Sequence, residues 1–277
     1  MIVDARLTLA RSDLARLELE GVVRADSFAP VKAMRLIIPG APIRAEPSLD
    51  GEQVDQLLFG EHFEVLELSE GFAWGQAARD GYVGWVEAAG LSARMLEPTH
   101  RVNALRTYAF ANPSIKSPPR GPISLNALVK VTEETATMAH ADGAGWIARR
   151  HLTEIGRGFA SPADVAEGFL GTPYLWGGRD SLGIDCSGLV QQAFYAAGRA
   201  CPRDSDLQAR LGVAVEPDHL ARGDLVFWRG HVGMMLNGER LLHANAHHMM
   251  VVIEPLAEAR ARIAAAGSGG PIAFRRV

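Results

Sequence analysis

The chain has 277 residues, of which 48% are hydrophobic and 22% charged, a balance typical of a globular protein that can bury a sizeable core. Twenty-eight basic and 32 acidic side chains give a net charge of −4, so the basic excess that nucleic acids or anionic membranes attract is missing. No apolar run reaches the roughly 18 to 20 residues that a bilayer span needs. We therefore expect neither nucleic acid nor a membrane as a partner.

The N-terminal segment carries charges at Asp4, Arg6 and Arg11, where a secretory signal needs an unbroken apolar stretch. Export by the general route is not expected, and the sequence predicts a cytoplasmic protein. The two cysteines, Cys186 and Cys201, are too few for a disulfide framework and suit a reducing compartment.

Four segments follow one another along the chain. Residues 1–30 show no single hydrophobic period and are expected to form an extended lead-in. Residues 31–97 contain short β-like runs between turns that carry Gly and Asp, which predicts a small β barrel. Residues 98–157 repeat this texture and predict a second small barrel, whereas residues 158–277 show longer helical patterns and form a separate domain.

The two β segments share a local signature. In each copy a Leu follows a Trp by six residues, as Leu91 follows Trp85 and Leu152 follows Trp146. The proline-rich stretch 112–122 cannot be a central strand or a helix, so we expect a loop within the second copy or a connector.

The C-terminal segment predicts an α+β layout. Ser161 is a good N-cap followed by Pro162, and CSGLVQQAFYAAG predicts an amphipathic helix that begins at Cys186 and ends at Gly198. The runs DLVFW, HVGMML and ERLLHA then predict neighbouring antiparallel strands. A helix N-terminus lowers the pKa of a thiol, so Cys186 has one device for activation, although a free cysteine at such a position is often a small packing residue.

Cysteine catalysis needs a base with an orienting partner, and His231 and His243 lie on adjacent predicted strands. A two-residue turn at 237–238 would pair Val232 with His243 and place the two histidines on opposite faces. A three-residue loop at 236–238, with Gly238 left-handed as a bulge, instead pairs Met235 with Glu239 and His231 with His243. We predict the bulged hairpin.

The motifs YLWGG, DCSGL, GDLVFW with HVGMML, and LLHANA occur in this order over about residues 160–277. They resemble the NlpC-type papain-like cysteine peptidases that cut bacterial cell-wall peptides. The upstream β segments resemble the bacterial SH3-like domains of one subgroup, the γ-D-glutamyl-diamino acid endopeptidases. The resemblance implies an α+β fold: two small SH3-like barrels precede a papain-like domain whose nucleophile begins a helix packed on an antiparallel sheet.

The resemblance also implies catalytic roles. Cys186 is the nucleophile, His231 the general base and acid, and His243 the polar third member that orients His231 and fixes its tautomer. No cofactor is expected. A metal site at His243, His247 and His248 is the weaker alternative, because HANAHH has no cysteine or acidic residue beside it.

The resemblance further implies a substrate pocket for a free α-amino group, a cation that needs a carboxylate and nearby hydroxyl acceptors. The residues expected to form it are Tyr174, Asp185, Ser187, Asp204 and Ser205. Tyr174 and Trp176 could instead pack in the core. We favour Tyr174 beside the thiolate, where its hydroxyl and the backbone N–H of Cys186 would stabilise the oxyanion.

In that subgroup an aromatic hydroxyl of the first SH3-like domain closes the cleft. Tyr82 in DGYVGW is the best match here, with a barrel-surface aromatic as the alternative and Glu46 as a fainter candidate.

The expected function is hydrolysis of the γ-D-glutamyl bond to meso-diaminopimelate or Lys in small muropeptides with a free N-terminal L-Ala, as in murein recycling. Two alternatives stay open: an amidase or acyltransferase on the same fold, because fold alone does not determine the acceptor, and a non-catalytic binder of wall fragments. Intact Cys186, His231 and His243 argue against the binder.

Overall fold

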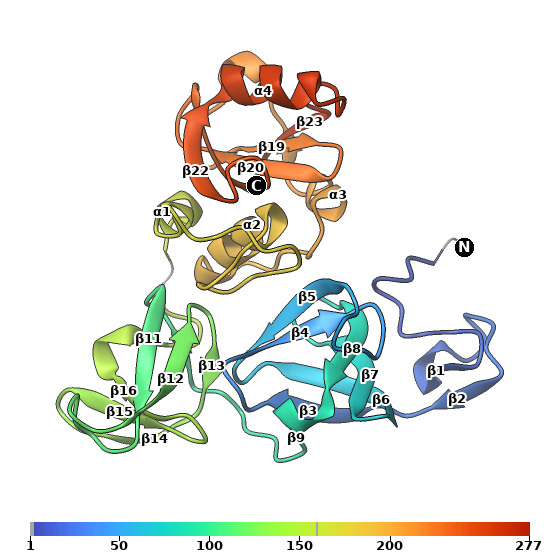
Figure 1. Ribbon diagram of the computed structural model, residues 1–277, viewed down its shortest axis with the longest axis vertical. Coiled ribbons are helices and arrows are strands. Elements are labelled where there is room, and N and C mark those ends of the chain that lie inside the picture. The colour runs from blue at the N-terminus through green and yellow to red at the C-terminus, as the bar shows by residue number, and fades with distance from the viewer. Residues whose placement is uncertain (1–2, 159) are drawn as a thin grey trace. The chain divides into compact units, whose positions relative to one another are not determined.

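The computed structural model describes residues 3–158 and 160–277 (Figure 1). It divides into two compact units, Met1–Ile155 and Gly156–Val277. The predicted α+β class is confirmed: β strands dominate the first unit, and the second combines helices with an antiparallel sheet. None of the described helices is both long enough and apolar enough to cross a membrane.

The segment before residue 31 is more than an extended lead-in. It contains β1 (Leu14–Arg16), a 3-10 helix (Leu17–Leu19) and β2 (Ser27–Ala29), and the two strands pair in parallel. Leu9 is fully buried and packs with Trp74 and Trp85. Part of the segment, around Leu9, thus belongs to the core of the first unit.

The first β module is a seven-stranded sheet in the order β5-β4-β8-β7-β6-β3-β9. Its strands are β3 (Lys32–Leu36), β4 (Gly40–Arg44), β5 (Gln53–Leu58), β6 (His62–Ser69), β7 (Phe72–Ala77), β8 (Val83–Glu87) and β9 (Leu91–Ser92). A 3-10 helix, Ala88–Gly90, joins β8 to β9. The alternation of the strands buries one face, whose members include Ile43, Leu57 and Phe63.

The second β module has a five-stranded sheet, β12-β11-β16-β15-β14, and a three-stranded one, β13-β10-β17. Its strands are β10 (His100–Val102), β11 (Arg106–Phe110), β12 (Pro119–Ser124), β13 (Leu128–Val129), β14 (Val131–Glu134), β15 (Met138–Ala141), β16 (Gly145–Ala148) and β17 (Leu152–Glu154). The proline-rich stretch is a loop only up to Pro118. From Pro119 it forms β12 at the edge of the sheet, where a missing N–H is tolerated.

The sequence echo between the two modules has a structural counterpart. Trp85 lies in β8 and Trp146 in β16, and each strand leads through a 3-10 helix, Ala88–Gly90 or Arg149–His151, into the short strand that begins with the matching Leu. The modules share one core cluster, because Leu58 and Phe59 of the first pack with Ala127 and Val129 of the second. This shared core explains why both modules form one compact unit.

The second unit has a six-stranded antiparallel sheet in the order β18-β23-β19-β20-β21-β22. Its strands are β18 (Val213–Ala214), β19 (Leu225–Trp228), β20 (His231–Met235), β21 (Arg240–Asn245), β22 (Met250–Pro255) and β23 (Ala273–Arg276). The helices are α1 (Pro162–Glu167), α2 (Cys186–Ala196), α3 (Ser205–Gln208), α4 (Leu256–Ala265) and a 3-10 helix, Pro217–His219. In Figure 1, α2 and α4 lie on opposite sides of the sheet.

Helix α2 begins at Cys186 as predicted, and Gly198 follows its end with a φ of 72°. The prediction that α2 is amphipathic, with one exposed face, is wrong, because every residue of α2 is buried, including Gln191 and Gln192. Helix α2 is therefore the central helix of the unit, and its position is held from all sides.

The β20–β21 hairpin differs from both registers considered from sequence. Met234 pairs with Leu242 and Met235 with Leu241, so the loop is 237–239 and Gly238 has no left-handed φ. Asn237 explains this loop, because its side-chain oxygen accepts the backbone N–H groups of Glu239 at 2.9 Å and Arg240 at 2.8 Å.

The observed register still places both histidines on one face. It puts His243 opposite Gly233, where an added Cβ would lie 3.2 Å from the His243 Cβ. His231 is two residues from Gly233 and so shares its face, because side chains alternate along a strand. Relative to the predicted pairing the strand has moved by two residues, an even number, which preserves the face.

Candidate active site

Cys186 is placed by the cap of α2. Asp185 is the N-cap residue, and its Oδ1 accepts the backbone N–H of Gly188 at 2.7 Å. Gly188 is required there, since an added Cβ would lie 2.4 Å from the carbonyl oxygen of Gly178.

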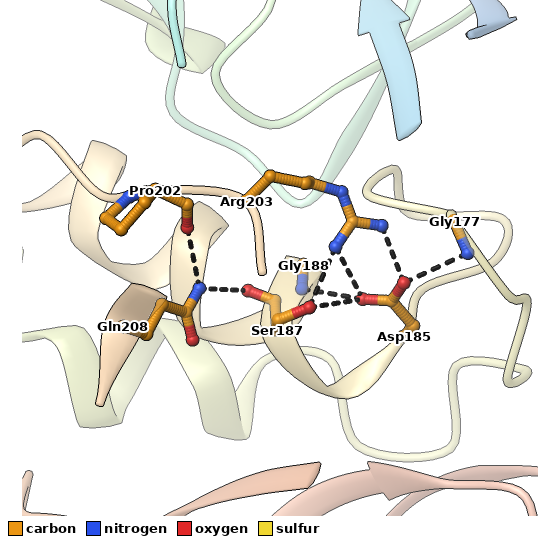
Figure 2. Close-up of polar contacts among 7 residues, drawn as sticks. All are labelled: Gly177, Asp185, Ser187, Gly188, Pro202, Arg203 and Gln208. Carbon is orange, nitrogen blue, oxygen red and sulfur yellow. Dashed lines mark hydrogen bonds and ion pairs between the residues drawn. The ribbon is translucent and has the colours of Figure 1, made fainter. Parts of the chain in front are cut away.

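The Asp185 carboxylate is occupied by protein donors, as Figure 2 shows. Arg203 donates from Nη1 to Oδ1 at 3.0 Å and from Nη2 to Oδ2 at 2.6 Å, and the N–H of Gly177 reaches Oδ2 at 2.9 Å. The Ser187 hydroxyl donates to Oδ1 at 3.2 Å and accepts from Arg203 at 2.8 Å. These bonds brace the start of α2, and the expected role of Asp185 and Ser187 in binding the substrate amine stays a prediction.

Arg203 is the residue that sequence reasoning missed here. Its neighbours Asp204 and Ser205 are expected site residues, but nothing in the local sequence distinguishes Arg203 from a surface arginine. Its side chain is 1% exposed, and a buried guanidinium needs a carboxylate partner. Asp204 and Ser205 lie at the start of α3, are partly exposed, and remain the candidates for the amine.

The surroundings of Cys186 act on its pKa in opposite directions. Burial raises the pKa of this thiol to about 12, and the charge of Asp185 adds to the rise, while the backbone N–H groups of Val232 and Ser187 and the charge of Arg203 lower it. The expected net lowering by the helix N-terminus is therefore wrong, because desolvation is the larger effect. The contact with Val232, which follows His231, places the thiol at the start of β20.

The two histidines are hydrogen bonded. His231 Nε2 and His243 Nδ1 are 2.8 Å apart, and His243 is completely buried. Burial lowers the pKa of His231 to about 3, helped by the charges of His243 and Arg262 and opposed by that of Glu254. Burial likewise lowers the pKa of His243. Both imidazoles are thus neutral near pH 7, which is the state a general base must have.

A second residue missed from sequence is Glu254 on β22. Its Oε1 lies 2.7 Å from His243 Nε2 and also forms an ion pair with Arg262 of α4. Burial raises the pKa of Glu254, but the hydrogen bond and charge of His243 and the charge of Arg262 outweigh it, so the pKa is lowered overall. Only the β21–β22 register, which pairs His243 with Val252, brings Glu254 to His243.

Tyr174 lies close to the nucleophile. Its backbone N–H donates to the carbonyl of Met249 at 2.9 Å, and burial together with the charges of Cys186 and Asp185 raises its pKa. The hydroxyl stays protonated and can donate a hydrogen bond. Trp176, for which core packing was an alternative, is 58% exposed.

A hollow of about 310 Å³ lies beside the candidate base. Its lining includes Tyr174, Trp228, Arg229, His231, Asn245 and Arg262. The guanidinium of Arg229 at this position suits a ligand that carries carboxylate groups.

Tyr82 is buried in the first unit just before β8, and its backbone N–H is held by Asp80 Oδ1 at 3.1 Å. Glu46 is exposed in the turn between β4 and β5. Both roles in substrate binding stay predictions. Cys186 and Cys201 are both buried and are not joined in a disulfide. Among the described residues, no group of three or more His, Cys, Asp or Glu side chains could hold a metal ion.

Comparison with known proteins decides the family. Residues 171–262 match the model of the NlpC/P60 family, and residues 43–91 match that of the bacterial dipeptidyl-peptidase SH3 domain. The chain belongs to the NlpC/P60 family. It is a cysteine peptidase of that family with SH3-like modules before the peptidase domain, as the sequence motifs predicted.

Two curated relatives of this NlpC/P60 peptidase extend over most of the chain. It is 29% identical to the gamma-D-glutamyl-L-lysine dipeptidyl-peptidase of Bacillus subtilis over 68% of this chain and 71% of that one. It is 26% identical to the dipeptidyl-peptidase 6 of Lysinibacillus sphaericus over 74% and 84%. A gamma-D-glutamyl-L-lysine dipeptidyl-peptidase of Bacillus cereus is 40% identical over 32% of this chain. The matched segment spans only 29% of that relative.

A solved structure supports the architecture. The crystal structure of an NlpC/P60 family protein from Bacillus cereus matches 88% of this chain and 99% of its own, with a TM-score of 0.73 and 22% identity. At this identity the likeness concerns the fold alone.

Alkylation of Cys186 is expected to depend on His231. In this buried setting the thiolate forms readily only when the imidazole takes the proton, because the two charges then stabilise each other. His231→Ala should slow iodoacetamide alkylation at pH 7 by at least about tenfold. In that variant the rate should keep rising toward the thiol pKa of about 12.

The measurement is mass spectrometry of the alkylated peptide over a pH series. Cys201→Ala in both backgrounds leaves a single thiol and serves as the control. Equal rates for the two proteins at pH 7 would show that His231 does not support the thiolate.

Proposed function

We propose that this enzyme hydrolyses the γ-D-glutamyl bond to a diamino acid in cell-wall peptides that begin with a free L-Ala, releasing the dipeptide L-Ala-γ-D-Glu. The observation that carries the proposal is the hydrogen bond between His231 and His243, with the Cys186 thiol beside the next residue of β20. The names of the Bacillus subtilis and Lysinibacillus sphaericus relatives support a dipeptidyl-peptidase.

The chemistry proceeds in two steps. Cys186 gives its proton to His231, its sulfur attacks the γ-carbonyl carbon, and the carbonyl electrons move to oxygen. The Tyr174 hydroxyl and the backbone N–H of Cys186 stabilise that oxyanion. His231 then protonates the leaving amine as the C–N bond breaks, leaving a thioester on Cys186. His231 then takes a proton from water as the oxygen attacks the thioester carbon. The C–S bond breaks, the dipeptide leaves with a free γ-carboxylate, and His231 returns the proton to the Cys186 thiolate.

The substrate extends in two directions from Cys186. Asp204 and Ser205 at the start of α3 bind the α-ammonium group of L-Ala, and the resemblance adds Tyr82 as a further contact. The hollow beside His231, with Arg229, receives the leaving diamino acid and its carboxylates. A role in murein recycling fits the small peptide substrate.

The first experiment compares L-Ala-γ-D-Glu-diaminopimelate with its N-acetylated form by mass-spectrometric product analysis. The acetylated peptide should be cleaved more slowly by roughly 100-fold or more, because removing one partner of a desolvated charge pair costs about 2–5 kcal/mol. Asp204→Asn should reduce this preference, since it removes the carboxylate that the ammonium needs.

Cleavage of both peptides at equal rates would contradict the amine requirement but keep the peptidase. Failure to cleave either would contradict the proposed substrate. Products that contain an added amine in place of water would favour the acyltransferase.

A further inference from the structure

We propose that Glu254 is a positioning residue that sets the tautomers of both histidines and so keeps the basic nitrogen of His231 toward Cys186. The inference rests on the proposed function of His231 as the base, and it concerns the protein's own proton placement. The juxtaposition runs across three adjacent strands, from His231 on β20 through His243 on β21 to Glu254 on β22, and ends at Arg262 on α4.

The register of the strands places these side chains in one row across the sheet. His243 pairs with Val252, and Glu254 lies two residues beyond Val252, so both side chains project from the same face. Helix α4 begins directly after β22, and its Arg262 forms the ion pair with the Glu254 carboxylate. With Arg262 as its counter-charge, this partly buried carboxylate remains ionised.

The tautomers follow from the contacts. An ionised carboxylate only accepts hydrogen bonds, so His243 must present Nε2–H to Glu254 at 2.7 Å. Neutral His243 then has its lone pair on Nδ1, which accepts a hydrogen bond from Nε2–H of His231 at 2.8 Å. The proton of neutral His231 is therefore on Nε2, and its Nδ1 is free to take a proton from the thiol.

Asn245 favours the opposite tautomer of His243. Its amide nitrogen lies 3.0 Å from His243 Nε2, and its Oδ1 accepts from the backbone N–H of His248 at 2.9 Å, which orients the amide. This NH₂ group could donate to Nε2 only if Nε2 carried no proton. The hydrogen bond to a carboxylate is the stronger of the two, so Glu254 prevails.

Removing Glu254 should therefore reverse the tautomers of both His243 and His231. In Glu254→Ala, Asn245 donates to His243 Nε2, the proton of His243 moves to Nδ1, and His231 must then accept on Nε2. Its proton lies on Nδ1, the wrong nitrogen for the thiol. We expect kcat/KM to fall by roughly 100-fold, the size seen when a group that orients a histidine is lost. Glu254→Gln keeps a hydrogen-bond acceptor without the charge, so the fall in kcat/KM should be smaller in this variant.

The double variant Glu254→Ala with Asn245→Asp tests the switch. The new carboxylate occupies the place of the Asn245 amide and again accepts Nε2–H of His243, so kcat/KM should recover to within about tenfold of wild type. Asn245→Asp alone leaves Glu254 in place and controls for the second change. Glu258→Gln on the exposed side of α4 is the matched control for losing a carboxylate and should leave the rate unchanged.

Nitrogen-15 NMR of the histidine rings gives a readout that needs no substrate. Wild type should show neutral His231 and His243 both protonated at Nε2, and Glu254→Ala should show both protonated at Nδ1. An unchanged tautomer in that variant overturns the proposal even if activity falls, because the loss would then be structural. Absence of peptide cleavage by wild type with the expected tautomers would instead count against the proposed function alone.

Discussion

Cys186→Ala is expected to lower kcat/KM by roughly 10⁴- to 10⁶-fold without unfolding the protein. The thiolate is the only atom in the proposed mechanism that bonds to the substrate, and no neighbouring group can replace a covalent intermediate. Alanine should fit the position, because residue 186 starts the buried helix α2 and alanine favours a helix.

The measurement is steady-state product formation by mass spectrometry, combined with calorimetric titration of the variant with the same peptide. Binding should persist, since Asp204 and Ser205 are intact. Cys201→Ala is the matched control: Cys201 is also buried, and the side-chain hydrogen bonds from Gln191 and Tyr195 go to its backbone carbonyl, which alanine keeps. Full turnover by Cys186→Ala would refute the thiol mechanism.

Arg203→Met is expected to lower the free energy of unfolding of the second unit by about 3–5 kcal/mol. The variant leaves the Asp185 carboxylate buried without its cation, at the N-terminus of the helix that carries Cys186. The rate should fall as well, because the thiol depends on the position of that helix end.

Urea unfolding followed by the far-ultraviolet helix signal measures this loss, because all four described α-helices belong to the second unit. Arg260→Met on the exposed surface of α4 should change the free energy by no more than about 0.5 kcal/mol. The double variant with Asp185→Asn should be less destabilised than the sum of the single variants, because it leaves no unpaired buried charge. If the free-energy changes of the two single variants simply add in the double variant, Arg203 and Asp185 do not form a stabilising ion pair.

Features that depend on neighbours in sequence were predictable. The start of α2 at Cys186 and the strands before and after residue 230 follow from motif position and hydrophobic period, and the structure confirms them. The common face of His231 and His243 was also predicted, although the pairing was wrong by two residues because Asn237 stabilises a later loop.

Features that depend on distant partners were not predictable. Arg203, 18 residues away in the chain, was not expected as the partner of the Asp185 carboxylate. The pKa of Cys186 was expected to be lowered by the helix N-terminus, but burial raises it. Both errors have one origin, since the extent of desolvation and the identity of a buried partner are set by packing.

The sequence by itself was enough to predict the candidate nucleophile and base, through motifs that resemble a known family, and the order of two β modules before a peptidase domain, because motifs, caps and alternation are local properties of the chain. Only the tertiary structure decided that Glu254 lies within hydrogen-bond distance of His243 and that Arg203 forms an ion pair with Asp185. Those contacts require a strand register and a helix position, and both are chosen by the packing of the whole unit rather than by any short stretch of residues.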